Sequence, residues 1–233
     1  MSIPTDRNQL RERWANGERF EFLFFYGHQP PERGVNDSCF SQWFVRDFSI
    51  DGIEYATAEH WMMAEKARLF QDEFILEAIL DSETPKEAKA LGRKVRGFDP
   101  IVWDENKFDI VVRGNYEKFT QHEDLKNYLL ATSVYVSSKE TLHSEEHSAE
   151  SGEEHSAEVR EQPMAYRVKK ILDSKVILVE AAGRDVIWGI GLGMNNPKAH
   201  DPATWRGRNL LGFALTVVRE KIASEELAKK RKT

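Results

Sequence analysis

Two charged residues stand where the helical pattern of residues 55–70 calls for apolar ones. At 100° per residue, Glu59 and Lys66 share one line with Met63 and Phe70. Because helical side chains lean toward the N-terminus, the lysine ammonium could return toward the carboxylate and form a catalytic pair in a cleft. The alternative is that Glu59 complements the helix dipole and that Lys66 extends past apolar neighbours to water.

The elements that must position these two residues are mostly helices. Thr57 is a good N-cap for the central helix, and the dipeptide Asp51-Gly52 before it is typical of a hairpin turn. Thr84 and Glu87 form a capping box for a later helix. Further helices are expected over 72–80, from 84 to the basic cluster near 92–97, over 99–119, over 122–130 and from about 210 to 228. Two buried strands are expected over 21–26 and 175–180, so the fold class is mainly α with a few short β-strands.

A glycine-containing loop follows the second expected strand. Asp185 and Trp188 come just before glycines at 189, 191 and 193, a spacing that matches neither a dinucleotide fingerprint nor a P-loop. Such a loop can hold site residues beside a closely approached ligand, so we place Gly189 and Gly191 in the binding site.

Composition sets the limits on domain organisation. The 233 residues, 40% of them hydrophobic, can bury one core, so we expect one domain over 20–228 between a frayed polar tail at 1–19 and a basic tail at 229–233. One cysteine and no apolar run of roughly 18 residues indicate an intracellular protein, cytoplasmic or nuclear, without a membrane partner.

The acidic charge is concentrated in one low-complexity stretch, residues 137–162. It holds eight glutamates against Lys139 and Arg160, which accounts for the whole formal net charge of −6. We interpret it as a solvated insertion rather than as a metal site built on His147 and His155. The rest of the chain lacks the positive excess of a protein that grips long duplex DNA, which leaves a small or single-stranded anionic ligand.

Several short motifs in a fixed order carry a resemblance to a known family. They are Phe40-Ser41-Gln42, Asp51-Gly52, Thr57-Ala58-Glu59-His60, Ala64-Glu65-Lys66, Leu91-Gly92-Arg93, Trp103, Lys118-Phe119, Leu130-Ala131-Thr132, Asp185-x-x-Trp188-Gly189-x-Gly191 and Trp205-x-Gly207-x-Asn209-x-Leu211-Gly212. Together they resemble the YbiA-like, or NADAR, family over about residues 21–224, without roughly 134–174. Gln42 stands where that family more often has asparagine, and Trp43 stands where it has phenylalanine.

The resemblance implies a compact, mostly helical YbiA-like domain with N-glycosidase activity that needs no metal or cofactor. By position, Glu59, Trp103 and Asp185 match family residues linked to activity, and Lys66 matches a lysine thought to act on the ribose. Glu59, Lys66 and Asp185 are therefore the predicted catalytic residues. The predicted substrate-binding residues are Trp103, Trp188, Arg93, Asn209, Ser41, Gln42, Tyr26, Gly189 and Gly191.

Breaking a bond between ribose C1 and a base nitrogen gives a reason for these residue types. Carboxylates can stabilise the sugar cation or move protons, whereas a neutral lysine could attack the opened sugar as a Schiff-base nucleophile. The leading hypothesis is removal of ADP-ribose from guanine in nucleic acid or nucleotides, with ADP-ribosylated single strands as possible partners. The alternatives are cleavage of phosphorylated riboflavin-pathway intermediates and non-catalytic binding of ADP-ribose.

Overall fold

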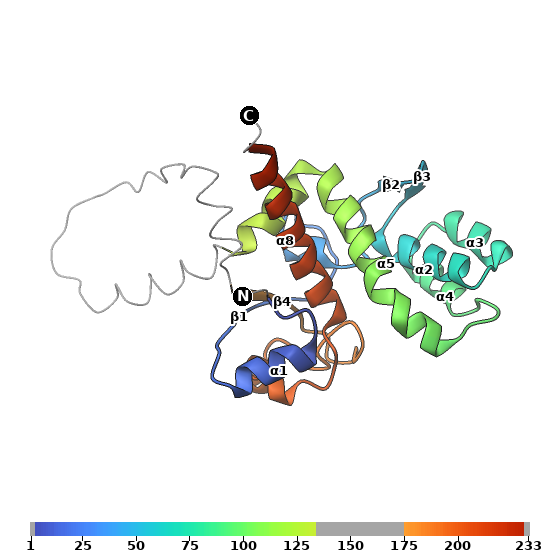
Figure 1. The fold of residues 1–233 in the computed structure, drawn as a ribbon. Coiled ribbons are helices and arrows are strands. Elements are labelled where there is room, and N and C mark those ends of the chain that lie inside the picture. The colour runs from blue at the N-terminus through green and yellow to red at the C-terminus, as the bar shows by residue number, and fades with distance from the viewer. Residues whose placement is uncertain (1–2, 134–174, 231–233) are drawn as a thin grey trace.

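The computed structural model describes residues 3–133 and 175–230, and the fold is mostly helical, as predicted (Figure 1). In chain order the elements are α1 (Arg7–Ala15), β1 (Glu21–Phe25), η1 (Asp37–Phe40), β2 (Phe48–Ile50), β3 (Ile53–Tyr55), α2 (Ala58–Leu69), α3 (Glu73–Leu80), α4 (Pro85–Gly92), α5 (Pro100–Gln121), a helix over 123–133, β4 (Val176–Glu180), η2 (Pro197–His200), η3 (Pro202–Thr204) and α8 (Leu210–Lys230). Every helix and strand predicted within the described residues is present.

A parallel pair of strands joins the two ends of the chain. β1 pairs with β4 in a register that sets Glu21 opposite Val176 and Phe25 opposite Glu180. Val176 to Val179 are all buried, as expected of a β-branched run covered on both faces. α8 packs against β4 and also lies alongside α5 (Figure 1).

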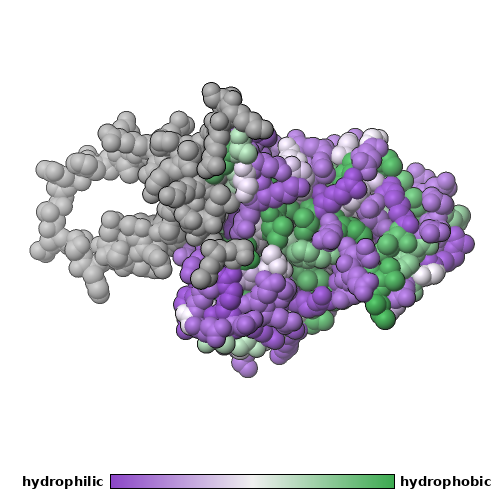
Figure 2. All heavy atoms as spheres, viewed as in Figure 1, coloured by the Kyte–Doolittle hydropathy of each residue, from purple (hydrophilic) through white to green (hydrophobic). Residues whose placement is uncertain are grey.

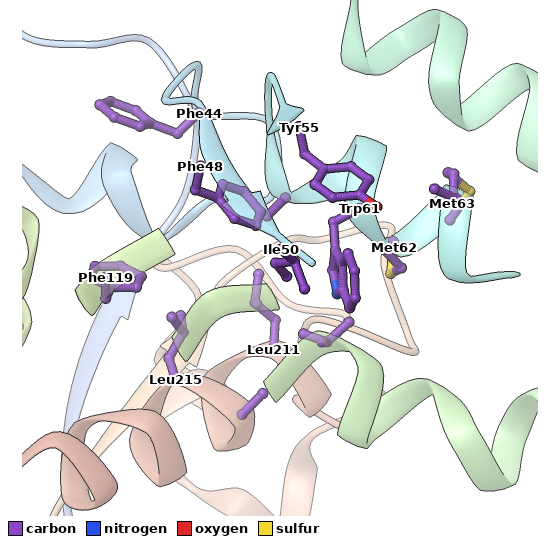
Figure 3. Close-up of a cluster of buried hydrophobic side chains, with 14 of the residues drawn as sticks. Phe44, Phe48, Ile50, Tyr55, Trp61, Met62, Met63, Phe119, Leu211 and Leu215 are labelled. Carbon is purple, nitrogen blue, oxygen red and sulfur yellow. The ribbon is translucent and has the colours of Figure 1, made fainter. Parts of the chain in front are cut away.

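Helix α2 is enclosed by α3, α4 and α5. The Thr57 hydroxyl caps it by accepting a hydrogen bond from the His60 N–H, which confirms the predicted start. The expectation of a single apolar stripe was wrong, because every residue from Ala58 to Ala64 is buried. Trp61 (Figure 3) is 2% exposed, and its indole donates a hydrogen bond to the carbonyl of Ile110.

A tight hairpin leads the chain into α2. β2 and β3 are antiparallel, and Asp51 and Gly52 between them have φ values of 54° and 80°, the left-handed conformation that this dipeptide favours. The predicted hairpin is therefore confirmed, and it delivers the buried Tyr55 against Trp61 with their rings 5.2 Å apart (Figure 3).

Residues 3–19 do not form the frayed polar tail that was expected over 1–19. Asp6 caps α1, and the single apolar residue at its centre, Leu10, is fully buried. Arg11 donates hydrogen bonds to the carbonyls of Pro202, Ala203 and Trp205. Arg11 therefore fastens α1 to the η3 segment by satisfying its carbonyl groups.

The predicted basic tail and the predicted acidic insertion lie partly or wholly outside the described residues. α8 continues to Lys230 instead of giving way to a tail at 229, and 231–233 lie outside the described residues. The predicted insertion at 137–162 lies wholly outside them. No helix in the described ranges is long and apolar enough to cross a membrane. In the view of Figure 2 the described surface is largely hydrophilic, with hydrophobic residues gathered in the middle of that face.

Candidate active site

Glu59 is a buried carboxyl in the first turn of α2. It is 2% exposed, its backbone N–H donates to the carbonyl of Gln42 at 2.9 Å, and its Oε1 has no hydrogen-bond partner. The pKa of Glu59 is raised to about 7, chiefly by burial and also by Asp185, while the Lys89 ammonium and a hydrogen bond from the Trp43 indole act against the rise. A carboxyl that changes charge near neutral pH suits proton transfer.

A second buried carboxyl was not predicted from the sequence. Glu180 is the last residue of β4, and its Oε2 is buried without a partner. The pKa of Glu180 is raised to about 8, chiefly by burial and also by Asp185 and Glu59, with Lys89 acting in the opposite direction. Asp185 and Lys89 act on both Glu59 and Glu180, so the three carboxyls form one electrostatic cluster around Lys89. The signal that could have found Glu180 was its position, a charged residue closing the clearest strand in the second half.

Two neighbouring cavities open at Lys89, Glu180 and Asp185 of this cluster, whereas Glu59 lines neither. The larger, about 1070 Å³, is lined by Tyr26, Lys89, Arg93, Ala181, Ala182, Gly183, Arg184, Asp185, Val186, Ile187, Trp188, Gly193, Met194, Asn195 and Asn196. The smaller, about 410 Å³, is lined by Phe25, Tyr26, Gly27, His28, Gln29, Ser41, Trp43, Lys89 and Glu180. Tyr26 and Lys89 border both cavities, so the two are adjacent parts of one site.

Helix α4 supplies the cations of the site. Its capping box is formed as predicted, with the Thr84 hydroxyl accepting from the Glu87 N–H and the Glu87 carboxylate accepting from the Thr84 N–H. Lys89 lies within the helix and Arg93 caps its end, four residues apart and so on one face. The Lys89 ammonium also lies over the Trp43 ring, 5.5 Å from its centroid.

The loop after β4 brings Asp185 and Trp188 to the larger cavity. One oxygen of Asp185 accepts hydrogen bonds from the N–H groups of Ile187 and Trp188, both at 2.8 Å, which fixes the loop. Gly189 packs so closely that an added Cβ would lie 2.8 Å from the carbonyl oxygen of Glu180, and Gly191 has a φ of 68°. The structure therefore gives both glycines a packing role in the loop that carries Asp185.

Asn209 holds the end of β4 through hydrogen bonds to its backbone. It is fully buried, and its side-chain amide accepts from the Glu180 N–H and donates to the carbonyl of Leu178, each at 3.0 Å. It lines neither cavity, in contrast to its predicted place among the substrate-binding residues. Its hydrogen bonds therefore fix the backbone of β4 next to Glu180.

Lys66 lies apart from Glu59, and the two form no ion pair. The Lys66 ammonium donates to the carbonyl of Gly92 at 2.8 Å and lies over the rings of Phe98 and Trp103, 4.0 and 5.7 Å from their centroids. Burial lowers the pKa of Lys66. Lys66 and Trp103 thus form a group at the C-terminal end of α4, and neither lines the two cavities.

The loop after η1 forms the wall of the smaller cavity. Ser41 lines it, and its hydroxyl accepts from the Trp43 N–H at 3.1 Å. Gln42 is buried with both polar atoms of its side chain unpaired. The fully buried Lys118 holds this loop by donating to the carbonyls of Cys39 and Ser41. Among the residues that the structure describes, no three His, Cys, Asp or Glu side chains are grouped to hold a metal ion.

Comparison with known protein families tests the family resemblance that the motifs suggested. The NADAR domain matches residues 24–141 and 167–223, which is most of the chain. The chain belongs to the NADAR family. The unmatched residues 142–166 overlap the predicted acidic insertion.

Individual relatives agree with this assignment. An N-glycosidase of Acanthamoeba polyphaga mimivirus is 35% identical over 208 residues, 87% of this chain and 97% of the relative. N-glycosidase YbiA of Escherichia coli strain K12 is 24% identical over 189 residues, 81% and 82% of the two chains. The NMR structure of E. coli YbiA has the same fold, with a TM-score of 0.58 at 22% identity, and the match covers 97% of this chain and 96% of that one. This NADAR protein is thus an N-glycosidase, a hydrolase of N-glycosyl bonds, with the predicted YbiA-like fold.

Proposed function

We propose that this NADAR N-glycosidase removes ADP-ribose from guanine bases in nucleic acid or nucleotides. The observation that carries the proposal is the buried carboxyl of Glu59, whose Oε1 has no hydrogen-bond partner and whose pKa, raised by burial, is lowered in part by Lys89 and Arg93, two cations that line the larger cavity. A carboxyl poised near neutral pH can take a proton from the attacking water, and the cations can bind phosphate close to it.

The larger cavity fits ADP-ribose better than a sugar with one phosphate. Its volume of about 1070 Å³ lies at the upper end of ordinary ligand sites, and it carries three cationic residues, Lys89, Arg93 and Arg184. A diphosphate bears two or more negative charges that such residues would balance. Large apolar residues also line it while remaining exposed, Met194 and Ile187 among them, which suits a flat adenine ring.

Within this proposal Glu59 acts as general base and Asp185 stabilises the positive charge that develops on the ribose. Both contribute to one electrostatic cluster, since each raises the pKa of Glu180. A nucleophilic role for Lys66, one of the alternatives that the sequence leaves open, would require its ammonium to leave the Gly92 carbonyl, and it stays a separate hypothesis with its own test.

A product assay separates the candidates. Purified protein is incubated with ADP-ribosylated guanosine and, separately, with a phosphoribosylamino-pyrimidine, and the products are resolved by chromatography, with Glu59→Gln as the control for contaminating activity. Release of ADP-ribose by the wild type alone supports the proposal. Release of free base only from the pyrimidine substrate would identify a riboflavin-pathway activity instead. Binding of ADP-ribose by calorimetry with no product from either substrate would indicate a non-catalytic reader.

A further inference from the structure

The side chain of Glu180 faces a different part of the site from Asp185. Glu180 lines the smaller cavity together with the aromatic side chains of Tyr26, His28 and Trp43, whereas Asp185 lines the larger, cationic one. The rings of His28 and Trp43 are 5.5 Å apart. An aromatic cavity suits a flat base, and a cationic cavity suits a phosphorylated ribose.

The backbone of Glu180 is held on both sides. Its N–H donates to the Asn209 amide oxygen at 3.0 Å, and its carbonyl accepts from the Ile190 N–H at 2.9 Å. The carboxyl therefore projects from a fixed point, yet its buried Oε2 has no partner. Because buried polar atoms are nearly always paired, this oxygen is one that a bound ligand would satisfy.

Resting on the proposed function, we propose that Glu180 is the acid that protonates the departing base nitrogen, with the base in the aromatic cavity and the ribose phosphates in the cationic one. The bond between C1 and nitrogen breaks, its electron pair stays on nitrogen, and the carboxylic acid of Glu180 supplies the proton. Water bonds to C1 and gives its proton to the Glu59 carboxylate. The net reaction consumes one water, and a proton returned from Glu59 to Glu180 restores the starting state.

The charges around Glu180 support this division of roles. The groups acting on it are Glu59 from α2, Lys89 from α4 and Asp185 from the loop after β4. Burial and the two carboxyls keep the pKa of Glu180 at about 8 despite Lys89, while that of Glu59 is about 7. Both carboxyls thus change charge near neutral pH, as proton transfer requires, and the aromatic cavity that Glu180 lines assigns it the role of acid.

The test measures kcat of Glu180→Gln and of wild type on two kinds of substrate. The two kinds carry the same sugar phosphate and differ in whether the leaving group must be protonated. The N-glycosides are ADP-ribosylguanosine and a phosphoribosylamino-pyrimidine, whose leaving amines must be protonated. The comparison substrates are the 4-nitrophenyl glycosides of the same sugar phosphates, because nitrophenolate leaves without a proton. Glu220→Gln is the matched control, since burial also raises the pKa of Glu220 but it lies on α8 and lines neither cavity.

We expect Glu180→Gln to lower kcat on the cleaved N-glycoside by roughly 10²-fold or more and on its nitrophenyl counterpart by less than about fivefold. We also expect the variant to lose the alkaline limb of the pH profile, while Glu220→Gln matches wild type throughout. Equal losses on both substrates, or none on either, would overturn the role of Glu180.

The choice of substrates keeps this result apart from the proposed function. Which N-glycoside the wild type cleaves decides the function, whereas the ratio between each N-glycoside and its nitrophenyl counterpart decides the role of Glu180. A wild type that cleaves neither N-glycoside overturns both.

Discussion

Replacing Glu59 by glutamine is expected to abolish activity and, at neutral to alkaline pH, to make the protein more stable. Both effects come from the same observation, a carboxyl that is 2% exposed with Oε1 unpaired. As the base of the proposed reaction it must be ionised, and ionisation inside the protein is what burial opposes. Loss of a general base lowers kcat by roughly 10²–10⁴-fold.

The stability gain can be worked out from the shift in pKa. The folded protein raises the pKa of Glu59 from 4.5 to about 7. Between these values the unfolded chain releases its proton while the folded chain keeps it, so wild-type stability falls as pH rises through this window and then levels off. At about 1.36 kcal/mol for each tenfold change in proton affinity, the loss above the window is about 3 kcal/mol. Glutamine at this position does not ionise, so the variant does not lose this stability as pH rises.

The assay is urea unfolding of wild type and Glu59→Gln from about pH 4 to pH 8.5, with the exposed Glu54→Gln on β3 as control. The difference in unfolding free energy between Glu59→Gln and wild type should be near zero at the acid end and should grow to about 3 kcal/mol at the alkaline end. A difference that does not change with pH, or a glutamine variant less stable than wild type at pH 8, would refute a buried carboxyl with a raised pKa.

Three other changes test separate features. Trp43→Phe removes the hydrogen bond that holds down the pKa of Glu59, so the acid limb of kcat/KM should move to higher pH; an unmoved limb would count against the contact. Gly212→Ala should lower the free energy of unfolding by about 3 kcal/mol or more, because an added Cβ would lie 2.0 Å from a β4 carbonyl oxygen. Gly92→Ala should lower it by less, because the added Cβ would meet the flexible side chain of a methionine. Denaturant titration of both variants measures the difference. Borohydride reduction of the reacting enzyme should trap a sugar adduct on Lys66 if it is a nucleophile, and a substantially active Lys66→Arg enzyme would exclude that role.

Features encoded within a few residues could be predicted from the sequence. The cap at Thr57, the capping box from Thr84 to Glu87 and the hairpin turn at Asp51-Gly52 each depend on a side chain or a φ preference acting on its immediate neighbours. The family motifs added Asp185 and Trp188, which the structure brings to one cavity.

The features that could not be predicted depend on partners distant in the sequence. Glu180 gains its significance from Lys89 and Glu59, which belong to other elements. The suggested pairing of Lys66 with Glu59 used helix geometry alone and could not include the Gly92 carbonyl, an acceptor that α4 brings to the lysine. Polar composition at residues 1–19 similarly hid Leu10, whose burial needs the loop that α1 packs against.

The parallel pairing of β1 with β4 has a consequence for how the protein is made. Tyr26 and Glu180 border one cavity because Phe25 pairs with Glu180, although most of the chain separates them. During synthesis the helices α2 to α5 can begin to pack on one another, but β1 has no partner until β4 leaves the ribosome. Closing so long a loop is slow, so the candidate site, which needs both strands, forms late. A nascent chain arrested before β4 would therefore hold Glu59 among α2 to α5 while still lacking Glu180, Asp185 and the helix α8 that packs on α5.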